Sequence, residues 1–161
     1  MTENQKPQRV IENRIHITAS PEVTWACFTD LSKWTNWFPA LTQVAWASGN
    51  PWTLKAQGMQ TFNLKFPCGE VQAVGTIIEI NPTQFVAWEG QIMGIDATWG
   101  LKFQPTADGT EVLVRHEFYG TPVFFSRLIR FPQRIRQIYS AALERFKQYV
   151  ETGNIQLAIP L

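Results

Sequence analysis

His116 is the residue best placed to do chemistry in this sequence. It lies between Val114 and Phe118 in an alternating run, so these three side chains share one apolar face of a predicted strand. An imidazole there either hydrogen bonds to a neighbour at the edge of a core or faces a ligand as a polar hook or general base. The other histidine, His16, falls on the polar face of its own predicted strand. His116 is therefore the catalytic candidate, and the other catalytic residues are unknown.

Other kinds of chemistry find little support. The predicted interior contains no pair of carboxylates, and the chain has no nucleophile elbow, phosphate loop or metal-ligand motif. Cys27 and Cys68 lie in unrelated segments and are expected to be reduced, buried thiols. We expect no cofactor and no metal. The balance of 14 basic to 13 acidic residues argues against nucleic-acid binding, which normally needs a strongly basic surface.

Three arginines recur at helical spacing near the C-terminal part of the chain. They are Arg127, Arg130 and Arg134, with phenylalanines interleaved at 124, 125 and 131. Such a stripe near the mouth of a cavity would suit peripheral contact with anionic lipid headgroups. The alternative is an ordinary solvated helix face.

The element that precedes the strands is rich in aromatic residues. Ser20 and Pro21 form a helix start, with Ser20 as the N-cap, and a second short helix carries Trp34 and Trp37. Asp30 or Ser32 is expected to cap this second helix. The segment contributes a large apolar area without a nucleophile, so we expect it to close one end of a hydrophobic container.

Strand patterns occupy most of the chain. Predicted strands cover residues 10–18, 42–47, 52–66, 70–80, 85–92, 97–103 and 110–119, and Asp108-Gly109 predicts a hairpin turn. In the fourth strand we place Val74, Thr76, Ile78 and Ile80 inward, because that choice puts Glu79 outward. A slip of one residue would reverse this assignment.

The chain closes with a helical pattern from 121 to about 151. Its apolar positions recur every three or four residues, Pro132 is expected to interrupt it, and Gly153 is expected to end it. An antiparallel sheet with one apolar face must be covered, and this helix is large enough. We therefore predict an α+β fold in which a curved antiparallel sheet of about seven strands wraps around the long C-terminal helix.

The order and spacing of these segments resemble the START/Bet v 1-like (SRPBCC) superfamily, whose fold is the helix-grip. The resemblance is carried by residues 15–23, 28–30, 34–39, 79–82, 86–88 and 108–112 and by the closing helix, and it is greatest for the polyketide cyclase/dehydrase-like subgroup. It implies one ligand-binding domain at 10–151, between a flexible N-terminus at 1–9 and a tail at 152–161. The polar residues 1–9 lack a signal-peptide pattern, so a cytoplasmic location is expected.

The resemblance and the strand periodicity together imply an internal apolar cavity. The first functional hypothesis is binding or transport of a small hydrophobic ligand such as a lipid, isoprenoid or polyketide-like molecule. The second is a polyketide cyclase/dehydrase-like enzyme, and the third is a protein-interaction module. The predicted ligand-binding residues are Trp34, Trp37, Thr76, Ile78, Trp88, Trp99, Leu101, Phe103, Val114, His116, Phe118, Ile138, Tyr139 and Ala142.

Overall fold

A curved antiparallel sheet and one long helix dominate the computed structural model, which describes residues 6–64, 69–120 and 130–153. In these residues the sheet has seven strands in the order β1-β7-β6-β5-β4-β3-β2. The elements follow the chain as β1 (Arg9–Ile17), α1 (Pro21–Thr29), the 3-10 helix η1 (Leu31–Lys33), α2 (Trp34–Trp37), β2 (Leu41–Ser48), β3 (Gln57–Asn63), β4 (Glu70–Asn81), β5 (Phe85–Ile92), β6 (Ile95–Thr106), β7 (Gly109–Tyr119) and α4 (Phe131–Thr152). This is the predicted helix-grip architecture.

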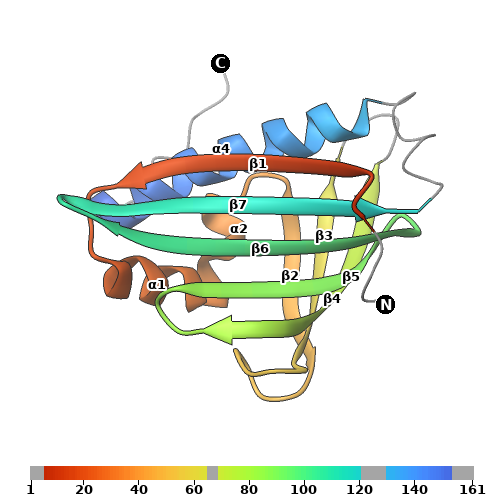
Figure 1. The fold of residues 1–161 in the computed structure, drawn as a ribbon, viewed down its shortest axis with the longest axis horizontal. Helices are drawn as coiled ribbons and strands as arrows, with labels where there is room; N and C mark the ends of the chain where they lie inside the picture. Colours follow the sequence, from red (N-terminus) through yellow and green to blue (C-terminus); the bar gives the residue numbers. More distant parts are fainter. Residues whose placement is uncertain (1–5, 65–68, 121–129, 154–161) are drawn as a thin grey trace.

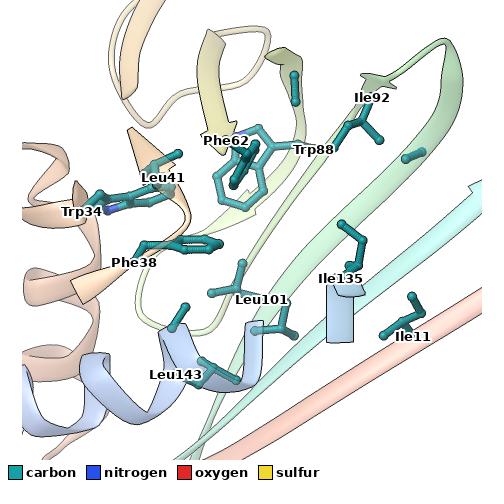
Figure 2. Packing of buried hydrophobic residues seen from close by; sticks show 14 of the residues in the cluster. Ile11, Trp34, Phe38, Leu41, Phe62, Trp88, Ile92, Leu101, Ile135 and Leu143 are labelled. Carbon is teal, nitrogen blue, oxygen red and sulfur yellow. The ribbon is translucent and has the colours of Figure 1, made fainter. Parts of the chain in front are cut away.

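The sheet curls strongly, so that β2 and β3 run from top to bottom of the view, behind the roughly horizontal β6 and β7 (Figure 1). Helix α4 lies along β1, and α1 and α2 gather at one end of the sheet (Figure 1). Figure 2 shows Ile135 and Leu143 of α4 among buried side chains of the sheet and of the α2–β2 segment, including Leu101 and Phe38. The hydrophobic core therefore occupies the space between the sheet and α4.

Side chains of α4 and β1 fasten the helix to the edge of the sheet. Lys147 Nζ donates to the His16 carbonyl at 2.6 Å, and Glu151 Oε1 accepts the Thr18 backbone N–H at 2.6 Å. Nearer the start of α4, the Asn13 side chain donates to the Arg136 carbonyl at 3.0 Å. Because an edge strand exposes unpaired backbone groups, these ties also cover part of the edge of β1.

The helix starts follow local sequence signals in part. The Ser20 side chain accepts the Val23 backbone N–H, and Pro21 opens α1, as predicted. Neither Asp30 nor Ser32 caps α2, because η1 comes between and the Ser32 hydroxyl donates to the Asp30 carboxylate at 2.5 Å. The predicted cap of the second helix is wrong.

Helix α4 begins at Phe131, so Pro132 lies in its first turn. Proline suits the first turn, where its missing N–H has no intrahelical partner to lose. Arg130 precedes the helix in the left-handed region, at φ 54°. Gly153 ends the helix with φ 66°, as predicted, and its N–H donates to the Tyr149 carbonyl. The expected helical stretch 121–129 lies outside the described residues.

Strand β3 begins at Gln57, five residues later than predicted. Trp52 and Lys55 both have positive φ angles, 55° and 66°, which breaks the extended backbone. The Lys55 N–H donates to the Ile77 carbonyl at 2.9 Å, outside the ladder that follows. The segment before Gln57 is therefore a turn.

The predicted inward face of β4 is wrong over most of its length. Ile78 is 44% exposed, and Thr76 lies on the same outer face. A β-bulge between Ile77 and Glu79 adds one residue, so alternation counted back through the bulge assigns the wrong face. Glu79 is exposed as predicted. The residues that do point inward before the bulge are Val71, Ala73, Gly75 and Ile77.

Candidate functional site

Two small voids lie between the sheet and α4 in the described part of the chain. The first void contains His116 in its wall and is called here the His116 void; its predicted wall residues are Trp99, His116, Phe118, Ile138 and Tyr139. The second is called the Trp37 void, with predicted wall residues Trp34, Trp37, Trp88, Trp99, Leu101, Val114, Tyr139 and Ala142. Most of the predicted site residues therefore lie around these two spaces.

Each void has a volume of about 30 Å³. A water molecule needs roughly 10–15 Å³ on this measure, whereas an apolar cavity that holds benzene is on the order of 150 Å³. Each void in this conformation therefore has room for one or two waters and not for an organic ligand. Binding of a ligand requires the two spaces to join.

Three side chains line both voids and form what we call the partition, namely Gln60, Trp99 and Tyr139. The Trp99 indole lies over Gly75, where an added Cβ would fall 2.5 Å from Trp99 Cζ2. Glycine at this position therefore makes room for the ring. Gln60 was missed by the sequence reading because an amide gives no sign that it faces an apolar interior.

His116 is 4% exposed, and neither ring nitrogen has a hydrogen-bond partner among the described protein atoms. It pairs with Trp99 across β6 and β7, and its ring meets Tyr139 edge-on with centroids 4.2 Å apart. Burial without a nearby charge lowers the pKa of His116 from 6.5 to about 3. The imidazole is therefore neutral at ordinary pH, and its two nitrogens are free to donate one hydrogen bond and accept another.

Tyr139 supplies a second polar group at the same place. Burial raises the pKa of its phenol above the usual value, so the hydroxyl keeps its proton. Among the described residues that line the two voids, none carries a charged side chain. The electrostatic character of the site is therefore neutral, with isolated hydrogen-bonding groups in an apolar wall.

The two tryptophans of α2 differ in their polar contacts. Trp34 Nε1 donates to the Phe28 carbonyl at 2.6 Å, whereas Trp37 Nε1 is buried without a partner among the described atoms. Both rings are nearly buried, at 4% and 5% exposure, and both line the Trp37 void. The expected closure of one end of the container is thus present, and it leaves one N–H unsatisfied.

Three predicted site residues do not line either void. Thr76 and Ile78 are on the outer face of β4, as described above. Phe103 is 2% exposed, but it packs against Trp25 and Phe28 in the aromatic cluster beneath α1, with ring centroids 5.4 and 5.5 Å apart. Its role in the structure is packing.

The predicted arginine stripe is only partly visible. Arg127 lies outside the described residues, and Arg130 is exposed just before α4. Arg134 Nη1 donates to the Leu64 carbonyl at 2.8 Å, so it is not simply a solvated side chain. Arg134 and Leu64 border an outer groove of about 500 Å³ between α4 and the end of β3, and Leu64 and Ile138 also line the His116 void.

The described residues contain neither a membrane-spanning helix nor a cluster of metal ligands. No helix there is long and apolar enough to cross a membrane. No group of three or more His, Cys, Asp or Glu side chains gathers there as a metal site would need.

Comparison with known proteins places this chain in a family. Residues 8–151 match the model of the family described as polyketide cyclase/dehydrase and lipid transport. The chain belongs to this family. The resemblance seen in the sequence is thereby confirmed, although no curated protein sequence matches the chain.

Solved structures agree on the fold. The protein TTHA0849 from Thermus thermophilus has a TM-score of 0.72 at 13% identity, over 88% of this chain and 97% of its own. The ZhuI aromatase/cyclase from Streptomyces sp. R1128 has a TM-score of 0.66 at 9% identity, over 91% and 98%. Ara h 8.0201 has a TM-score of 0.67 at 13% identity, over 88% and 97%. At these identities the likeness concerns the fold.

Proposed function

We propose that the chain binds a small, uncharged hydrophobic molecule in the space between the sheet and α4. The observation that carries the proposal is His116, a polar side chain 4% exposed with no partner for either nitrogen among the described atoms, in the wall of a mostly apolar void. A buried polar group without a partner normally costs stability, so its presence calls for a reason. A ligand that hydrogen bonds to the imidazole supplies one.

The energetics permit such binding despite the small volume of the voids. A ligand with the area of an aromatic side chain, roughly 150–250 Å², gains about 4–6 kcal/mol when buried. Moving a partition side chain off its preferred rotamer costs about 0.5–1.5 kcal/mol. All three partition residues are half-buried, and Gln60 is the one with a flexible side chain and no ring. The gain from ligand burial therefore exceeds the rotamer cost of moving one partition side chain, before the loss of translational and rotational freedom on binding is counted.

The aromatase/cyclase among the structural relatives raises an enzymatic alternative, in which His116 would act as a general base. A general base works best with a pKa near the working pH. The pKa of His116, lowered to about 3, makes the imidazole a weak proton acceptor at neutral pH. We therefore place binding ahead of catalysis for this chain, and the interaction-module hypothesis has no comparable feature in its favour.

The test reduces the volume of the Trp37 void with a larger side chain on α4. Ala142 is 1% exposed and lines the Trp37 void, so Ala142→Leu places three more carbons there. Ser140→Leu, on the exposed face of the same helix, is the matched control. Naphthalene is titrated into each protein while amide chemical shifts are followed, and thermal unfolding reports whether each variant folds.

The proposal expects saturable shifts of residues around both voids in the wild type and in Ser140→Leu, and weaker binding by tenfold or more in Ala142→Leu. If Ala142→Leu does not fold, Val114→Leu blocks the same void from the sheet. Native mass spectrometry of the purified protein adds a direct search for a bound molecule. Absence of saturable naphthalene binding to the wild type would rule the proposal out.

A further inference from the structure

The indole N–H groups near the Trp37 void differ in their hydrogen bonding. Trp34 Nε1 donates to the Phe28 carbonyl at 2.6 Å, and Trp52 Nε1 donates to the Thr29 carbonyl at 2.9 Å. Trp37 Nε1 has no partner among the described atoms, although the ring is 5% exposed. Two of these indoles are thus anchored to backbone, and the third has a buried donor without a partner among the described atoms, on a ring that lines a void.

A second unpartnered group lies in the wall of the other void. His116 lines the His116 void but not the Trp37 void, and Trp37 lines the Trp37 void but not the His116 void. The partition side chains border both spaces. Joined, the two spaces form one apolar space with a free N–H donor on one side and a free imidazole on the other.

We infer that the ligand of the proposed function is an uncharged ring compound with two separated oxygen groups, one accepting the Trp37 N–H and the other hydrogen bonded to His116. This inference rests on the binding function proposed above and specifies its ligand class. Rings are favoured because both ends of the space are walled by aromatic side chains. Charge is disfavoured because the described wall has no ion to pair with, and an unpaired buried ion is costly.

Ordered water is the competing occupant. Each void is large enough for a water molecule, which needs two to four polar partners to be held well. Gln60 and Tyr139 of the partition could join His116 or Trp37 in holding one. A site built only to hold water would give an incoming ligand no advantage for carrying oxygen groups at two ends, so the two interpretations differ in a measurable way.

The experiment compares ligands that differ only in hydroxyl groups. The first series is naphthalene, 2-naphthol and 2,6-dihydroxynaphthalene, and a longer series is biphenyl with its 4-hydroxy and 4,4′-dihydroxy derivatives. Affinities are measured by chemical-shift titration for the wild type, Trp37→Phe, His116→Leu and the double variant. Trp52→Phe is the matched control, because its N–H is already bonded to the Thr29 carbonyl and its ring lines neither void.

In the wild type, each hydroxyl in at least one series should strengthen binding about five-fold, the factor expected for one net hydrogen bond. In Trp37→Phe and in His116→Leu the dihydroxy ligand should bind only as well as the monohydroxy ligand. In the double variant the three ligands of the series should bind alike. Trp52→Phe should keep the wild-type order, with two gains of about five-fold.

The inference is overturned if the parent hydrocarbon binds the wild type but hydroxyl groups give no gain in either series, which would leave the void walls to ordered water. It is overturned equally if the gains persist in the double variant. Failure of the parent hydrocarbons to bind at all is a different result, because it removes the proposed function itself. The two failures are therefore distinguishable.

Discussion

Replacing His116 with leucine should make folding stability less sensitive to acid. The unfolded chain takes up a proton on this histidine near pH 6.5, whereas the folded protein resists protonation until about pH 3. Between these values the unfolded state binds more protons, so stability falls as the pH is lowered. The contribution is fully present above pH 6.5, declines below it and levels off near pH 3.

The magnitude follows from the two pKa values. Each pH unit in this window costs about 1.4 kcal/mol, so the wild type loses about 2 kcal/mol through His116 between pH 7.5 and 5.0. The leucine variant lacks this loss. At pH 7.5 it should already be more stable by about 1–3 kcal/mol, because an apolar side chain of similar size removes a buried group without partners.

The assay is urea unfolding followed by tryptophan fluorescence at pH 7.5, 6.5, 5.0 and 4.5. Acidic residues titrate in both proteins, so the difference in unfolding free energy between wild type and His116→Leu isolates the histidine. Phe118→Leu, in the same strand and the same wall, changes packing without changing a titratable group and should give a pH-independent difference. A wild-type minus His116→Leu difference that stays constant within about 0.5 kcal/mol from pH 7.5 to 4.5 would refute the burial of a neutral imidazole.

Further predictions concern the tryptophans and their neighbours. Trp34→Phe should lower the unfolding free energy by about 1–3 kcal/mol in urea, because the Phe28 carbonyl loses its donor. Trp37→Phe, which removes an N–H without a partner among the described atoms, should lower it by clearly less in the same assay. Gly75→Ala should cost about 1–3 kcal/mol and change the near-UV circular dichroism, because the new methyl group displaces the Trp99 ring; an unchanged spectrum would contradict that packing.

Much of the fold was predictable because its signals are local. Alternation placed Val114, His116 and Phe118 on one inward face, and the cap at Ser20 and the glycine at Gly153 marked helix ends that the structure confirms. These patterns depend on residue type and spacing, which a sequence displays directly. The prediction of an antiparallel sheet is confirmed, whereas the pairing of β1 with β7, from the two ends of the strand series, was not predicted.

The errors arose where backbone geometry changes without a residue that announces it. The bulge between Ile77 and Glu79 involves no glycine or proline, so the alternation through β4 gave no warning. The positive φ angle at Trp52 could not be predicted from residue type either, because a bulky aromatic residue rarely adopts it. Gln60 was missed at the partition for a different reason, since its position between two voids depends on how far the sheet curls. Local patterns do not specify that curvature.

Hydrogen bonds hold α4 on both of its long sides, with three on the β1 side and one, from Arg134, on the side of Leu64. Along one long side, three hydrogen bonds hold the helix to β1 and the residue after it, from Arg136 to Glu151. On the other side, Arg134 fastens the helix to the Leu64 carbonyl beside the outer groove. A helix held in this way would rotate about its contacts with β1 when the Arg134 hydrogen bond breaks. Leu64 and Ile138 line both the outer groove and the His116 void. The Arg134–Leu64 hydrogen bond would then control the association and dissociation rates of a ligand, whereas the interior side chains would determine its affinity.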